Sequence, residues 1–402
     1  MLPAAPPAAP PAAQLPLPDE LLEDIFLRLD AAEDLARAAV SCASFHRVVS
    51  ARGFLRRFRS LHPPPVLGFI DSSHGATRFY QAQPPRKSAP AARAFAQAAD
   101  FTFSFLANPS RWRVRDTRDG RVLLARPAAS FDVFDEFVVY DPLHRRHFKI
   151  PPIPGDLTAF TAAAGNRSYE SYFEPFLAPA CREEEESSLR VFCNVMSKTK
   201  IVTFVFSLVT GMWQAIASFS IGTHEWKRYG FPIFTRRYCA HGCFYWTDYC
   251  LKVMLVLDTP EMKYSLVDLP PESKGKDKSI VEVAEGRLGL LILDDFKFHL
   301  YSKDWRSNGA DAEEWRHDNV IPLPDRYWSI SIYGAAEGYV LLRGIPQDQY
   351  NSWKSTEKKP DAQYYTLELK ALLFERLCVL KFETCPDYLY ASFPPPLSPP
   401  SI

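Results

Sequence analysis

The chain has 402 residues, of which 47% are hydrophobic and 23% are charged, so it can bury a large core and is not globally disordered. Lys plus Arg and Asp plus Glu each total 47, and this zero net charge argues against nonspecific binding to nucleic acid or to anionic membranes. The eight cysteines show no disulfide-framework spacing, which predicts free thiols in a reducing compartment, the cytoplasm or the nucleus.

The two ends of the chain differ in composition from the rest. Residues 1–16 form a Pro/Ala-rich segment without the basic and apolar regions of a secretory signal, and we expect a disordered tail there. Residues 394–402 form a second proline-rich tail. Between the tails, Pro63, Pro64 and Pro65 separate a helical domain at residues 17–60 from a larger domain at residues 66–393.

The helical domain shows one clear apolar stripe. Leu21, Ile25 and Leu29 recur every four residues, and acidic residues at the start of this helix suit the positive end of its dipole. Two further short helices and a final turn around Phe54 to Phe58 follow. A unit of about forty residues has more apolar surface than three short helices can bury. We therefore expect either a partner or the rest of the chain to cover part of it.

The run LPDELLEDIFLRL, followed by DLARAAVSCASFHRVV and FLRRF, resembles the F-box motif in its plant form over residues 17–58. The resemblance implies docking onto the Skp-type adaptor of an SCF (Skp–cullin–F-box) ubiquitin ligase and, through that adaptor, onto cullin and RING subunits. The adaptor-binding residues that it implies are Leu17, Pro18, Leu21, Ile25, Leu29, Leu35, Val40, Cys42, Phe45 and Val49. The family usually has Trp at the position of Phe45, and the smaller ring is expected to cost ~1 kcal/mol of docking energy.

The larger domain repeats short apolar runs that are separated by turn residues, at irregular intervals of roughly 40 to 70 residues. Such runs begin at Phe137, Val205, Met254, Gly289 and Gly338. The fold class we predict is mixed, with a small all-α, three-helix unit followed by a large all-β domain. A β-propeller is favoured over a β-sandwich because several similar units fill the region. The plan resembles the F-box-associated β-propellers of plants, while the absence of a Gly-Gly pair argues against kelch repeats.

Three segments of the larger domain receive specific predictions. Residues 81–94 and 162–188 are expected to be loops. The uncharged segment 201–223 is long enough to cross a membrane, but its polar residues and a turn at Thr210-Gly211 favour two strands.

A search for chemical motifs predicts no catalytic, cofactor-binding or metal-binding residues. The chain has no glycine-rich phosphate loop and no nucleophile elbow. Cys239, His241 and Cys243 could share one face of a strand, and we interpret them as buried, reduced residues rather than as a zinc site. Arg111 and the alternating Arg113 and Arg115 could hold an acidic target, but an exposed, solvated strand face is favoured.

These observations predict a substrate-receptor subunit of an SCF-type ubiquitin ligase rather than an enzyme. The helices would bind the Skp-type adaptor, and the β domain would bind an unknown protein substrate. No cofactor, nucleic acid or membrane partner is expected. Two alternatives stay open at this point. The chain could be a propeller-type enzyme with helical decoration, or an F-box scaffold that acts outside the ligase.

Overall fold

The computed structural model describes residues 17–29, 32–72, 77–127, 134–159, 171–177, 190–197, 200–207, 209–221, 227–228, 231–232, 236–283, 286–305, 314–356, 359–382 and 384–393. These residues divide into two compact units, of which the first ends at Pro64 and the second runs from Pro65 to Phe393. The tails predicted at residues 1–16 and 394–402 lie outside the described part of the chain.

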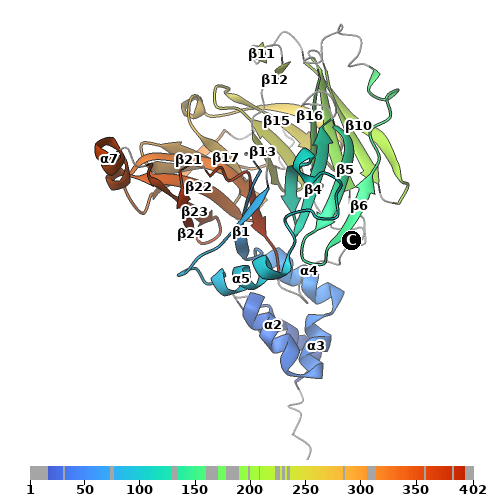
Figure 1. Cartoon of the computed structure of the whole chain (residues 1–402), viewed down its shortest axis with the longest axis vertical. Helices are drawn as coiled ribbons and strands as arrows, with labels where there is room; N and C mark the ends of the chain where they lie inside the picture. The colour runs from blue at the N-terminus through green and yellow to red at the C-terminus, as the bar shows by residue number, and fades with distance from the viewer. Residues whose placement is uncertain are drawn as a thin grey trace, which may run out of the picture. The chain divides into compact units, whose positions relative to one another are not determined.

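The first unit is helical (Figure 1). Its helices are α1 (Asp19–Phe26), α2 (Ala32–Ser41), α3 (Ala43–Val49) and α4 (Arg52–Leu61). The turn expected near Phe54 is thus a complete ten-residue helix, α4. Leu29 lies beyond the end of α1. Among the described residues, no helix is long and apolar enough to cross a membrane.

The second unit is a six-bladed β-propeller, which confirms the predicted fold class and excludes the β-sandwich. Its described residues form five four-stranded antiparallel sheets and one three-stranded sheet. Blade 1 comprises β3 (Arg113–Arg118), β4 (Arg121–Pro127), β5 (Phe134–Asp141) and β6 (Arg146–Ile150). Blade 2 comprises β7 (Ser171–Leu177), β8 (Arg190–Ser197), β9 (Lys200–Ser207) and β10 (Met212–Ser220). Blade 3 comprises β13 (Arg236–Ala240), β14 (Cys243–Thr247), β15 (Val253–Asp258) and β16 (Lys263–Asp268).

The remaining blades complete the ring. Blade 4 comprises β17 (Lys278–Glu282), β18 (Leu288–Asp294), β19 (Lys297–Lys303) and β20 (Arg316–Pro322). Blade 5 comprises β21 (Tyr327–Ala336), β22 (Tyr339–Pro346), β23 (Asp361–Glu368) and β24 (Leu373–Lys381). Blade 6 comprises β25 (Tyr388–Ala391), β1 (Val66–Asp71) and β2 (Arg78–Gln81). The short strands β11 (Lys227–Arg228) and β12 (Phe231–Pro232) pair with each other.

The apolar runs found in the sequence correspond to different strands of their blades, which explains their irregular spacing. Three of the runs are the third and fourth strands, namely β5–β6, β9–β10 and β15–β16. A fourth run forms the second and third strands β18–β19, and the last one contains β22. The uncharged segment 201–223 contains β9 and β10, joined at a turn in which Gly211 has a φ of 66°, as predicted.

Two predicted loops contain regular structure. Helix α5 (Ala89–Ala98) begins inside residues 81–94, and Phe95 is its single large apolar residue, so no apolar stripe marks it in the sequence. Strand β7 lies within residues 162–188. Its Glu174 and Pro175 interrupt the apolar alternation that identifies a strand from sequence. The prediction of continuous loops in these two segments was therefore wrong.

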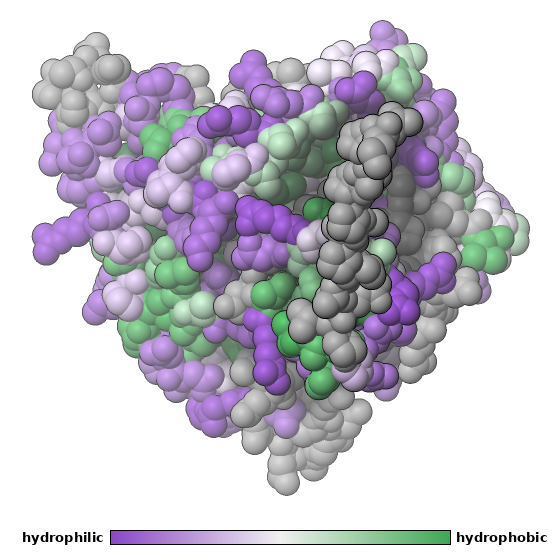
Figure 2. Space-filling model, turned by 90° about the horizontal axis from the view of Figure 1, so that it is seen from below, coloured by the Kyte–Doolittle hydropathy of each residue, from purple (hydrophilic) through white to green (hydrophobic). Residues whose placement is uncertain are grey.

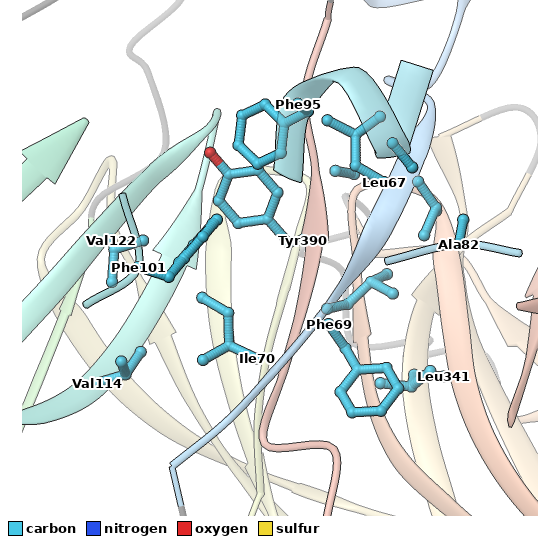
Figure 3. Close-up of a cluster of buried hydrophobic side chains, with 14 of the residues drawn as sticks. Leu67, Phe69, Ile70, Ala82, Phe95, Phe101, Val114, Val122, Leu341 and Tyr390 are labelled. Atoms are coloured by element: carbon cyan, nitrogen blue, oxygen red, sulfur yellow. The ribbon is translucent and has the colours of Figure 1, made fainter. Parts of the chain in front are cut away.

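Blade 6 closes the ring because it joins strands from both ends of the propeller sequence. Strand β1 pairs with β2 on one side and with the C-terminal strand β25 on the other, and blue β1 lies beside the red end of the chain in Figure 1. Successive side chains of β1 point to opposite faces of the sheet. Figure 3 shows Phe69 directed toward Leu341 of blade 5 and Ile70 directed toward Val114 of blade 1. The closing strand thus packs against both neighbouring blades.

The first strands of the blades line the propeller axis, where a buried ion-pair network joins three blades. Arg237 of β13 lies 3.1 Å from Asp116 of β3 and 2.6 Å from Glu174 of β7. All three side chains are at most 13% exposed. The indole of Trp246 donates to Glu174 at 2.9 Å, and the guanidinium lies 4.4 Å above the ring of Phe176. Burial lowers the pKa of Arg237, but the two carboxylates outweigh burial and leave that pKa above its ordinary value.

Replacing Arg237 with methionine is expected to lower the free energy of unfolding by about 3–5 kcal/mol, because it removes the guanidinium that both buried carboxylates contact. Urea unfolding of the full chain measures this change. Lys381→Met is the matched control, since Lys381 forms an exposed ion pair with Asp361 at 2.6 Å and such pairs contribute about 0–1 kcal/mol. Equal losses in the two variants would contradict a structural role for the network at the axis.

A second charged group near the axis is sensitive to pH. Glu337 lies in the turn between β21 and β22, and one of its carboxylate oxygens accepts the backbone N–H of Asp119 at 3.3 Å. Burial raises the pKa of Glu337 to about 7, the negative charge of Asp119 adds to this effect, and the Arg118 guanidinium opposes it. Since the ordinary pKa is 4.5, the folded chain binds this proton more tightly than the unfolded chain. The resulting stability is complete below about pH 4.5 and is lost as the pH rises through about 7.

Glu337→Gln should therefore remove one component of the pH dependence of stability. The parent and this variant should have similar free energies of unfolding at pH 5, and the variant should be more stable at pH 8 by about 1–3 kcal/mol. Urea unfolding at four pH values between 5 and 8 provides the comparison. Glu261→Gln, which changes an exposed turn carboxylate, serves as the control. Parallel pH profiles for the parent and Glu337→Gln would contradict the prediction.

Candidate functional site

Helix α1 has two apolar faces, and only one of them is buried. Leu22 and Phe26, four residues apart, are 6% and 5% exposed. Leu21 and Ile25 are also four residues apart, and they are 49% and 48% exposed. Leu17, just before the helix, is 42% exposed. A helix that needs only one apolar face for its own packing therefore presents a second apolar face to solvent.

The buried face of α1 packs into an aromatic cluster. The ring of Phe26 meets Phe45 edge to face at 5.1 Å and Phe54 at 6.4 Å. Phe54 stacks on Phe58, and Phe58 in turn stacks on His62, whose ring nitrogen lies 2.8 Å from the carbonyl oxygen of residue 27. Rings in such edge-to-face contacts add about 0.5–1.5 kcal/mol per pair beyond their buried area. The cluster thus connects α1 with α3 and α4.

Two ion pairs link the polar side of α1 to α3 and α4. Asp19 accepts from Arg47 of α3 at 2.9 Å, and Glu23, one turn later, accepts from Arg57 of α4 at 3.3 Å. The sequence analysis noted the acidic residues at the start of this helix but not their arginine partners. The spacing of the two carboxylates at i and i+4 was a signal for one charged face, but their arginine partners lie 28 and 34 residues away.

Of the predicted adaptor-binding residues on helices α2 and α3, some are buried and others are exposed. Leu35 and Val49 are 0% exposed, whereas Val40 is 77% exposed. Cys42 forms the N-cap of α3, and its Sγ accepts the backbone N–H of Phe45 at 3.4 Å. A cap of this kind satisfies one of the free N–H groups at a helix start.

The ten predicted adaptor-binding residues therefore fall into three groups. The exposed ones are Leu17, Pro18, Leu21, Ile25, Val40 and Cys42. Leu29 and Phe45 are half-buried, and Leu35 and Val49 are buried in the interior. Direct contact with another protein is open to the exposed group. The two interior residues can influence docking only through the packing of the helices in this conformation. All ten remain predictions as adaptor contacts.

The arginines that the sequence analysis placed on one strand face lie in different surroundings. Arg111 lies in a short 3-10 helix, η1 (Pro109–Arg111), and is exposed. Arg115 lies on β3 at the propeller axis, where it donates to the Tyr172 hydroxyl at 3.3 Å and lies 4.9 Å from the ring of Phe134. The prediction that Arg115 belongs to an exposed strand face was wrong, because β3 is the innermost strand of its blade.

Figure 2 shows hydrophilic residues spread widely over the face seen from below, with smaller hydrophobic groups between them.

The cysteine motif forms no cluster of metal ligands. Cys239 is half-buried, Cys243 is buried, and burial raises the pKa of both thiols. The ring of His241 contacts the backbone carbonyl of Arg287 at 2.9 Å instead of either thiol. Across the described residues, no group of three or more His, Cys, Asp or Glu side chains is placed to hold a metal ion.

Comparison with known proteins places the N-terminal unit in a family context. The family model described as F-box-like matches residues 15–61. No curated protein matches the chain. Among solved structures, YCF48 from Cyanidioschyzon merolae is similar at 10% identity and a TM-score of 0.38, covering 78% of this chain and 86% of that one. A chain of the "Crystal Structure of Mitotic Checkpoint Complex" has 7% identity and a TM-score of 0.32, covering 69% of this chain and 79% of that one.

The protein YjhT has 10% identity and a TM-score of 0.31, covering 65% of this chain and 81% of its own.

The helical unit carries the match to a named family, and the blades follow it in the chain. The N-terminal unit of this chain is thus an F-box-like domain, and it precedes a six-bladed β-propeller.

Proposed function

We propose that this chain is the substrate-receptor subunit of an SCF-type ubiquitin ligase. In this role the F-box-like domain binds a Skp-type adaptor, which connects it to cullin and RING subunits in the cytoplasm or nucleus. The propeller binds a target protein. The observation that carries the proposal is the exposed apolar face of Leu17, Leu21 and Ile25 inside the segment that matches the F-box-like model.

The energetics of this face favour a protein partner. Burying the exposed half of one such leucine or isoleucine contributes about 0.8–1.5 kcal/mol. Side chains spaced at i and i+4 on one helix can enter a hydrophobic groove together. The aromatic cluster of Phe26, Phe45 and Phe54 holds α1 against α3 and α4 before binding, so little conformational entropy is lost on docking.

The proposed mechanism is proximity rather than bond chemistry in this chain. One polypeptide would hold the adaptor through its helices and the target through its blades. A target held in this way reaches a high effective concentration near the ubiquitin-charged enzyme that the other subunits recruit. The buried carboxylates Asp116 and Glu174 at the propeller axis both pair with Arg237, an arrangement that suits a structural core.

The two ends of the propeller offer different surfaces to a target. Alternating strand directions place the chain entry at Pro65 and the exit at Ser392 at the end that also carries the two-residue turns 119–120, 241–242 and 337–338. The opposite end carries the connections that contain η1, η2 (Pro271–Ser273) and α7 (Gln347–Thr356), whereas α5 begins at the Pro65 end, where the Ser88 hydroxyl donates to the Val66 carbonyl. Binding residues are concentrated on long connections of rigid scaffolds. We assign target binding to the end that carries η1, η2 and α7.

Co-purification of the full chain with a Skp-type adaptor tests the proposed function. The parent chain should form a stable complex. Leu21→Asp combined with Ile25→Asp should reduce binding at least 100-fold, because two charges would have to be buried in an apolar contact. Both side chains are about half exposed in the free protein, so the folded content measured by circular dichroism should not change.

Matched controls come from the propeller. Val209 and Met212 are 83% and 65% exposed at the β9–β10 turn, and the double change Val209→Asp with Met212→Asp should leave adaptor binding intact. A parent chain that fails to bind the adaptor would overturn the proposal. Recovery of cullin with the parent chain distinguishes a ligase subunit from a scaffold that binds the adaptor alone.

A further inference from the structure

Two histidines meet on the outermost strand pair of blade 4. His299 lies on β19 and His317 lies on β20. Their ring centroids are 5.3 Å apart, and Nδ1 of His299 lies 3.2 Å from Nε2 of His317. His299 is half-buried and His317 is exposed, so solvent reaches the pair. This pair has no role in the proposed function.

A register shift between the strands creates this contact. Residues 300 and 319 are paired, but the next residue of β19, Tyr301, pairs with His317, so Asp318 is an extra residue in β20. His317 therefore lies on the same sheet face as Tyr301 and diagonally opposite His299. The Tyr301 ring meets His317 at 4.9 Å and limits its rotation. The bulge thus directs one nitrogen of each imidazole toward the other.

The separation of the two nitrogens matches the geometry of a shared metal ion. Zinc–nitrogen bonds of about 2.0–2.1 Å at a tetrahedral angle place two ligand nitrogens about 3.3–3.4 Å apart. The observed 3.2 Å is close to this separation, and each ring must turn so that the two nitrogen lone pairs meet at the ion. A hydrogen bond between the two rings fits the same distance. Metal titration must therefore distinguish a bound ion from such a hydrogen bond.

We infer that His299 and His317 form a chelating site for a borderline divalent cation of the zinc, nickel and copper class. Imidazole nitrogen is a preferred ligand of these ions. Asp318 does not complete the site, because its carboxylate is bound by Ser302 and, at 2.7 Å, by Arg316. With no third protein ligand among the described residues, water fills the remaining coordination positions.

Metal binding at this position would connect the edge strand to the rest of its blade. Strand β20 pairs with β19 on one side only. An ion held by one side chain from each strand adds a cross-strand link that opens only when a coordinate bond breaks. Because the ion binds the folded pairing and not the unfolded chain, it should raise the melting temperature in proportion to the logarithm of its concentration.

Titration of the full, metal-free chain with ZnCl2, NiCl2 and CuCl2 in a calorimeter tests the inference. We expect a site of one ion per chain that binds copper more tightly than nickel or zinc. His299→Gln and His317→Gln should each weaken that site at least about tenfold, because even outer-shell changes at metal sites cost this much. The zinc-induced rise in melting temperature should disappear in both variants.

His147→Gln is the matched control, because His147 is an exposed strand histidine that stacks on Phe105 at 4.3 Å instead of facing a second histidine. This variant should bind metal as the parent does. Circular dichroism without metal should be the same for all four proteins. Binding that survives both His299→Gln and His317→Gln, or no saturable binding to the parent, would leave the pair as a hydrogen bond only and overturn the inference.

Discussion

Closure of the blade ring is the constraint on which the propeller depends. Every blade needs a neighbour on both faces to bury its apolar side chains, and only a closed ring supplies one to each blade. The pairing of β1 with β25 provides this closure from opposite ends of the sequence. It also brings Pro65 next to Ser392, whose backbone N–H donates to the Pro65 carbonyl at 3.2 Å. The two ends of the described propeller segment therefore lie next to each other.

The charges at the propeller axis follow from the same closure. Inner strands converge on the axis, and their side chains fill the space between them. Arg237 fills this space with a flat guanidinium that contacts an aromatic face and two carboxylates. Such a network adds little net stability over an apolar core, but it is strongly disfavoured when one member is missing. It thus favours one relative arrangement of blades 1, 2 and 3.

The F-box-like domain follows the opposite principle. Its interior needs Leu22 and Phe26 but not Leu21 and Ile25, and the latter pair is half exposed in this structure. The sequence analysis left open whether a partner or the same chain covers the stripe, and the exposure of Leu21 and Ile25 supports the partner. One face of this short helix packs in the interior and another is available to the proposed partner. This is possible because residues four apart share a helix face and adjacent residues do not.

The sequence by itself determined that a helical unit precedes a β domain, and it indicated the helical stripe of α1 and the strand hairpins of the propeller, because these depend on residues a few positions apart. It could not identify α5 or β7, whose alanines and interrupted alternation resemble loops. It also could not tell that Arg115 faces the axis, or that Leu35 and Val49 are interior while Val40 is exposed. These outcomes, like the meeting of His299 and His317 across a bulge, depend on which distant segments pack together. Only the tertiary structure decides them, since local periodicity specifies a face but not the neighbour that covers it.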